Sequence, residues 1–240
     1  MVCELIGAKL LAPYFGTSLY VWAAALALTL GGLTLGYFIG GNLSRVHAGS
    51  RALLYKVLIA AGTLLGLMPF SSSIIMDQTI HLSLEAGAIC SLLIFMLPPL
   101  LFMGMVSPII INLLTQEAVQ AGNNAGNVYA ISTLGGILMT FLMGFFIIPN
   151  YGLTNPAIIS GIILATLPII SLIKKNGIRA TPMLLLLAVS CFLSFKPNQP
   201  FNDEYQILYQ SEGILGQVKV VDHPSYGITP DARMGRGLIV

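Results

Sequence analysis

The chain has 240 residues, of which 56% are hydrophobic and 8% are charged, and its formal net charge is +2. Soluble domains carry about 25% charged residues, so this chain is too poor in charge to cover a surface that faces water. The composition therefore excludes an ordinary soluble protein. The small net charge, without any Lys- or Arg-rich tract, also gives no reason to expect nucleic acid as a partner.

The opening residues 1–12 are apolar, but Pro13 follows them after about 12 residues. A helix needs about 20 apolar residues to cross a bilayer, so this segment is expected to be the second half of a helix whose first half is missing. Glu4 and Lys9 lie within it, where a charge is costly and is a functional candidate by default. The simpler interpretation, which we favour, is that the two charges neutralise each other or that Lys9 reaches the headgroups.

Six further segments are expected to be membrane helices, because each is apolar and near the length of a crossing. They cover residues 18–43, 52–70, 86–105, 124–148, 155–173 and 181–195. Pro98, Pro99 and Pro108 are expected to interrupt or kink the third segment, with a short amphipathic helix over 108–120. The predicted fold class is an all-α polytopic membrane helix bundle of about six to seven segments.

Lysine and arginine predict the orientation, because cytoplasmic loops are enriched in them. The loops at 44–51 and 174–180 are basic, whereas the connection between the second and third segments carries only Asp77 and Glu85. Alternating crossings place both basic loops on one side, the cytoplasm. The tail is then outside if residues 181–195 cross the membrane, and cytoplasmic if they do not.

Two segments carry small residues at every fourth position, which is the spacing of one helix face. The first face consists of Gly32, Gly36 and Gly40, and the second of Ser132, Gly136, Thr140 and Gly144. Small residues let membrane helices approach closely, so both faces are expected to be packing surfaces, with the lining of a substrate path as the alternative.

Few other residues suggest chemistry. Glu117 and Asn127 are polar candidates near the start of the fourth segment, although an interfacial loop explains them equally well. The three cysteines and three histidines have no metal-ligand spacing, so no metal site is expected. No phosphate-binding glycine loop or nucleophile motif occurs either, and we therefore expect no catalytic residue and no cofactor site.

The composition changes at residue 196, where a polar linker containing two prolines begins. Two strand-like runs follow at 205–210 and 217–222, separated by a stretch with Gly213 and Gly216. We predict a transmembrane domain over 1–195 and a small β-hairpin appendage within 196–240.

Three stretches resemble the membrane-integrated spermidine synthase-like family, the fusion of a major-facilitator type membrane domain with a spermidine synthase. They are ELIGAKLLAPYFGTSLYVW at 4–22, GLTLGYFIGG at 32–41 and AGNVYAISTLGG at 125–136, with a weaker match at Ser107 and Pro108. In that family, a Rossmann-type aminopropyltransferase domain that would bind decarboxylated S-adenosylmethionine follows the membrane domain. Residues 207–222 and 236–240 resemble its first strands.

The resemblance implies polyamine biosynthesis, a transferase family and the inner membrane of a bacterium. The family's glycine-rich cofactor loop and catalytic aspartate have no counterpart in this sequence, so whether this chain is an enzyme is left open and it is expected to be inactive alone. Two alternatives remain: a transporter for polyamines or another small solute, and a non-catalytic membrane scaffold. The expected partners are the lipid bilayer and a second copy or a separate soluble protein.

Overall fold

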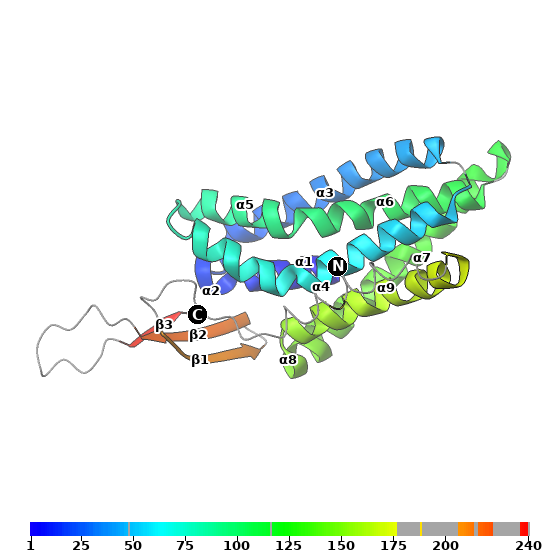
Figure 1. Ribbon diagram of the computed structural model, residues 1–240. Coiled ribbons are helices and arrows are strands. Elements are labelled where there is room, and N and C mark those ends of the chain that lie inside the picture. The colour runs from blue at the N-terminus through cyan, green and yellow to red at the C-terminus, as the bar shows by residue number, and fades with distance from the viewer. Residues whose placement is uncertain are drawn as a thin grey trace, which may run out of the picture.

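Five long apolar helices dominate the computed structural model of the chain (Figure 1). The structure describes residues 1–47, 49–115 and 117–176, the single residue Ala188, and the backbone of three strands. Within this part, five helical stretches are long and apolar enough to cross a bilayer. The predicted class, a polytopic helical membrane bundle, is confirmed at this level. The sixth predicted segment, 181–195, lies outside the described residues apart from Ala188.

The helical elements follow one another with short connections. In chain order they are α1 (Val2–Leu10), α2 (Ala12–Phe15), α3 (Leu19–Val46), α4 (Arg51–Thr79), α5 (Leu84–Phe95), α6 (Leu97–Leu114), η1 (Ala118–Gln120), α7 (Ala121–Leu142), η2 (Met143–Ile147), α8 (Ile148–Tyr151) and α9 (Thr154–Asn176).

The short N-terminal segment lies inside the bundle. α1 and α2 meet at Leu11, and Pro13 stands in the first turn of α2, where a helix tolerates proline because its first amides have no acceptor. Ile6 and Leu11 are completely buried, in a core cluster to which α3, α4, α5 and α9 also contribute. Figure 1 shows the N-terminus midway along the bundle. A segment too short to cross a membrane is thus a core helix.

Glycine allows the closest approach between helices in two pairs. On α3, a Cβ atom added to Gly36 would collide with the Leu101 carbonyl and Gly104 of α6. On α4, a Cβ added to Gly62 would lie 2.6 Å from the carbonyl oxygen of Gly161 of α9. Contact between helix backbones gives the dispersion attraction that holds membrane helices together when lipid is as apolar as the side chains.

α4 is longer than the sequence suggested, since it continues past residue 70 to Thr79. Three consecutive serines would be expected to end the helix. Instead, each donates a hydrogen bond to the carbonyl three residues earlier, at 3.2 Å for Ser71, 2.9 Å for Ser72 and 3.0 Å for Ser73. Their hydroxyls are therefore satisfied within the helix, and the run does not end it.

The third predicted segment is divided at Met96, between α5 and α6. Pro98 and Pro99 fall at the start of α6, where they fit, and Pro108 lies inside α6 without ending it. The separate amphipathic helix predicted over 108–120 was therefore wrong. An interior proline removes one amide donor, and packing of α6 against α3 holds the remaining turns in place.

α7, η2 and α8 form one helical stretch of 31 residues. No residue of α7 is buried, yet Met143 and Ile148 at its far end belong to the core. Met143 is the first residue of the π-helical stretch η2, which joins α7 to α8.

Three strands, β1 (Gln206–Gly213), β2 (Gly216–Asp222) and β3 (Arg236–Ile239), form one sheet in the order β1-β2-β3. β1 pairs antiparallel with β2, placing Gln206 opposite Asp222 and Gly213 opposite Gly216, and β2 pairs antiparallel with β3. The linker after residue 195 and the stretch before β3 lie outside the described residues. The appendage within 196–240 therefore stays a prediction.

Candidate functional site

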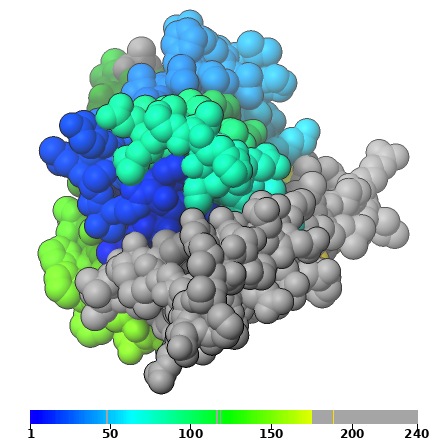
Figure 2. All heavy atoms as spheres, turned by 90° about the vertical axis from the view of Figure 1, so that its left-hand side faces the viewer, coloured from blue at the N-terminus to red at the C-terminus, as the bar shows by residue number. Residues whose placement is uncertain are grey.

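Polar side chains meet at the end of the bundle formed by α2, the last turn of α4 and the beginning of α5. Figure 2 faces this end and shows the N-terminal segment (blue) between the α5 region (teal) and the α8 region (light green). The hydroxyl oxygens of Thr79 and Ser91 are 2.6 Å apart, and both residues are buried. This hydrogen bond links α4 to α5 across the turn that connects them.

Tyr14 and Asp77 form a second polar contact at the same end. The Tyr14 hydroxyl donates a hydrogen bond to the Asp77 carboxylate, which ties α2 to α4. Burial raises the pKa of Tyr14 above its ordinary value, and the negative charge of Asp77 raises it further. The hydroxyl is therefore protonated and able to donate over the whole physiological range. A protonated phenol bound to a carboxylate is a structural contact and not a nucleophile.

The sequence offered weak signals for these contacts. Asp77 stands out in the sequence only as an acid of the connection between the second and third predicted segments, and Tyr14 only as part of the stretch 4–22. The two residues belong to elements that are far apart in the chain, and no local pattern predicts such a long-range approach.

The first predicted polar pair, Glu4 and Lys9, lies on α1 with both side chains half-buried. Five residues of separation place the two about 140° apart around a helix, so they point to different faces. Figure 1 shows the N-terminus, where α1 begins, about midway along the bundle.

Glu117 and Asn127, the other predicted polar candidates, belong to the opposite end. Both are exposed, Glu117 before η1 and Asn127 on α7. The amide of Asn124 donates to the Leu114 carbonyl at 3.2 Å and contacts the Thr115 hydroxyl at 3.4 Å, so this residue holds the connection between α6 and α7. The structure does not bring these residues to α1, and the four polar candidates form no single site.

The two faces of small residues differ in their surroundings. Gly32, Gly36 and Gly40 of α3 are buried against α6. On α7, an added Cβ at Gly136 would meet only the Met1 side chain, at 3.3 Å, and one at Gly144, in η2, would meet nothing within 4 Å. Ser132 and Thr140 lie on the same α7 face, and the Thr140 hydroxyl donates to the Gly136 carbonyl of its own helix.

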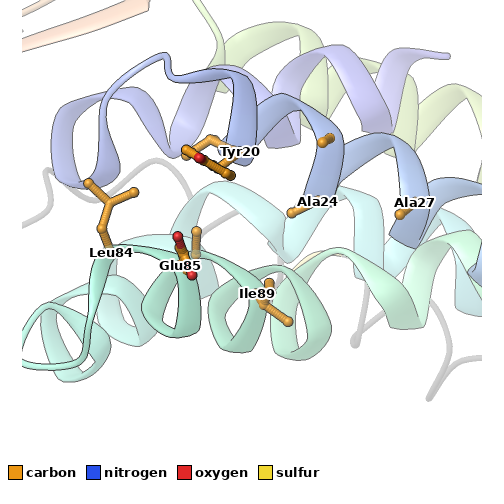
Figure 3. Close-up of a pocket in the computed structure, with 9 residues that line it drawn as sticks. Tyr20, Ala24, Ala27, Leu84, Glu85 and Ile89 are labelled. Carbon is orange, nitrogen blue, oxygen red and sulfur yellow. The ribbon is translucent and has the colours of Figure 1, made fainter.

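A groove with a volume of about 320 Å³ lies between the beginnings of α3 and α5 (Figure 3). Alanines and aliphatic side chains make up most of its wall, with one carboxylate and one phenol at its end. The lining residues are Tyr20, Val21, Ala23, Ala24, Ala27, Leu84, Glu85, Ala88 and Ile89. The sequence did not suggest this groove, because its two walls are more than fifty residues apart in the chain.

The part of the chain that the structure describes contains no group of three or more His, Cys, Asp or Glu side chains able to hold a metal ion. Comparison of the whole chain with family models, with curated proteins and with solved structures finds no match.

Proposed function

We propose that the chain is the multi-pass membrane domain of a spermidine synthase-like protein. In this proposal it anchors a soluble domain or a separate soluble protein at the membrane and does not itself catalyse a reaction. The observation that carries the proposal is the position of α1 and α2. The stretch that resembles the family's opening motif is also the segment around which the bundle packs. If this packing is needed for folding, the residues of the motif would be selected because they fit between the other helices.

Individual residues of that stretch have clear structural reasons. Pro13 begins α2, and Gly16 follows it with φ of 72°, a left-handed conformation that favours glycine. The Ser18 hydroxyl then accepts a hydrogen bond from the Val21 amide at 3.5 Å and caps α3. Together these residues reverse the chain between the core helix and the first full crossing, which explains why such a motif would recur in a family of anchors.

The orientation in this proposal follows the basic loops. Residues 44–51 and 174–180 would face the cytoplasm of a bacterium, and the connection between the second and third predicted segments, which carries Asp77 and Glu85, would face outward. If residues 181–195 cross the membrane, the proposed spermidine synthase-like β region within 196–240 would begin on the outer side. Decarboxylated S-adenosylmethionine would not be supplied there, which supports an anchoring role over an aminopropyltransferase activity.

A transporter is the second candidate, and the described geometry favours it less. A path for a polycation requires carboxylates that converge on a cavity, because a charge in hydrocarbon must pair or be hydrated. Glu4 and Glu117 belong to different regions of the bundle, and the groove between α3 and α5 is lined almost entirely by apolar side chains. Its single acid, Glu85, is exposed at one end.

Two measurements on the full chain in lipid nanodiscs and liposomes test the proposal. We expect no saturable binding of a labelled decarboxylated S-adenosylmethionine analogue, and no uptake of labelled spermidine beyond that of empty liposomes. Tight binding of the analogue would overturn the non-catalytic assignment. Uptake that Glu4→Gln abolishes, and Glu117→Gln does not, would establish the transporter instead.

A fusion experiment tests the anchoring role directly. Residues 1–176 joined to a soluble fluorescent protein should carry it into the membrane fraction and resist extraction by alkaline carbonate. The same fusion lacking residues 1–15 should be lost to aggregation or degradation, because the core would be left open. Stable insertion without residues 1–15 would contradict a role for α1 and α2 as the centre of the anchor.

A further inference from the structure

The groove between α3 and α5 opens where a membrane lipid would lie. Tyr20, Leu84 and Ile89 are 66%, 49% and 44% exposed, although they belong to helices that pass through the bilayer or lead into it. Large apolar side chains that are exposed on a membrane helix face lipid tails. Ala24 and Ala27, one turn apart on α3, leave a channel between the helices because their side chains are short (Figure 3).

The size and lining of the groove fit one hydrocarbon chain. Its volume of about 320 Å³ is at the lower end of the range found for ligand pockets, about 300 to 1,000 Å³. The floor includes Ala88, which is 2% exposed. An apolar channel of this kind gives dispersion contacts to an acyl chain, but no hydrogen bonds that would orient a polar solute.

The end of the groove carries a negative charge. Glu85 lies in the first turn of α5, at the same level as Tyr20 in the first turn of α3, and Figure 3 shows the two on facing sides of the groove. With the exception of Lys9 on α1, the basic residues of the described helices lie at the opposite end of the bundle. A carboxylate beside an apolar channel at the membrane surface matches a ligand that carries a cationic group on a hydrocarbon chain.

We infer that this groove binds a phosphatidylethanolamine molecule, with an acyl chain along the alanines and the primary amine on the Glu85 carboxylate. The ammonium group has three N–H donors, so it forms charge-assisted hydrogen bonds that the choline headgroup cannot form. Lipids with a net negative headgroup would be repelled by Glu85. The inference depends on the membrane location of the helices and not on the function proposed above.

Trp22, the chain's only tryptophan, provides a reporter on α3. It neighbours the groove residues Val21 and Ala23 in sequence, and its half-buried side chain packs against the core cluster beside the groove helix. Bromine atoms on an acyl chain quench tryptophan fluorescence at short range. The experiment reconstitutes the full chain in phosphatidylcholine nanodiscs and replaces part of the lipid with brominated phosphatidylethanolamine, phosphatidylcholine or phosphatidylglycerol. Site binding appears as quenching that saturates at a low mole fraction of one lipid.

Two matched pairs of variants separate the headgroup from the channel. Glu85→Gln removes the charge, and Glu117→Gln is its control, an exposed acid at the other end. Ala27→Phe fills the channel, and Ala130→Phe is its control, an exposed alanine on α7. Because all four side chains are exposed, folding should survive, and a thermal unfolding curve of each variant checks that it does.

The expected result is saturable quenching by phosphatidylethanolamine only. Glu85→Gln should raise the mole fraction needed for half-maximal quenching about two- to five-fold, the range for an exposed ion pair. Ala27→Phe should leave only the linear quenching of bulk lipid, and both controls should behave like the original chain. Equal quenching by all three lipids, preference for phosphatidylglycerol, or saturable quenching that persists in Ala27→Phe would each overturn the inference.

Discussion

At the scale of single residues, the glycines of α3 differ in whether their helix face leaves room for a side chain. Gly36 lies against backbone atoms of α6, which cannot move aside as a flexible side chain could. Gly31, on the same helix, has nothing within 4 Å of an added Cβ. Only the first position requires the absence of a side chain.

Gly36→Ala is therefore expected to destabilise the bundle by about 1–3 kcal/mol, the usual cost of overpacking, because α3 and α6 must separate. Gly31→Ala is the control and should be neutral or slightly stabilising, since alanine is the better helix former. Unfolding in mixed micelles at increasing fractions of a denaturing detergent measures both free energies. Equal stability of the two variants would show that α3 and α6 do not meet at Gly36.

The hydrogen bond from Tyr14 to Asp77 yields a prediction at the same scale. Tyr14→Phe should lower the free energy of unfolding by about 1 kcal/mol, because the half-buried Asp77 carboxylate loses a donor. Tyr129→Phe, at a 47% exposed position on α7, is the matched control and should change little. Thermal unfolding of the two variants beside the original chain gives the comparison.

The same contact predicts a dependence on pH. The folded-state pKa of Tyr14 is raised above the ordinary value of 10.0, so the stability it contributes is fully present below pH 10. That contribution should be lost as the pH rises from there toward the folded-state pKa. Unfolding curves between pH 8 and about pH 11 should converge for the original chain and Tyr14→Phe. A constant difference across this range would show that folding does not raise the pKa of Tyr14.

At the scale of elements, the short helices α1 and α2 contribute much of the buried core. Leu11, at their junction, is 0% exposed, and the cluster around it includes side chains from most of the crossings. Helices that are apolar on every side do not reveal in their sequence which face will be buried. Contact with α1 and α2 selects the buried faces, because the longer helices pack around these two.

Leu11→Ala should thus destabilise the bundle by about 1–3 kcal/mol. Water-soluble cores lose about 2–5 kcal/mol in such a change, but lipid is as apolar as leucine, so mainly the cavity and the lost contacts count here. Leu19→Ala, at an 82% exposed position, should cost far less. The midpoint of thermal unfolding in detergent distinguishes the two. A larger loss for Leu19→Ala would mean that α1 and α2 are not at the centre.

At the scale of the whole molecule, the order of crossings sorts charge between the two ends. α3 ends and α4 begins near Arg45 and Arg51, and α9 ends near Lys174, after an even number of further crossings. Asp77 and Glu85 lie at the other end, where α4 stops and α5 starts. Apart from Lys9, the basic residues of the described helices thus lie at one end of the bundle, and Asp77 and Glu85 lie at the other.

Labelling of introduced cysteines tests the orientation. In a background without the three native cysteines, Ser50→Cys should react with a membrane-impermeant maleimide only after the bacterial membrane is permeabilised. His81→Cys should react in intact cells. Gln199→Cys, in the linker, should follow His81→Cys if residues 181–195 cross. Reaction of Ser50→Cys and His81→Cys from the same side would contradict the alternating arrangement.

The sequence by itself determined the class of the protein, the presence of several long apolar helices in the described part and the existence of faces built from small residues. Each of these depends on quantities that are local along the chain, namely the length of an apolar run and the spacing of residues around a helix. The resemblance of residues 4–22 to the spermidine synthase-like family stays a prediction.

Only the tertiary structure decided how these parts are used. It placed α1 and α2 in the core, brought the glycines of α3 against α6, and left the similar face of α7 exposed. It also joined Tyr14 to Asp77 and formed the groove between α3 and α5. The physical reason is that every face of these helices is apolar, so the faces that meet are selected by the fit of side chains far apart in sequence.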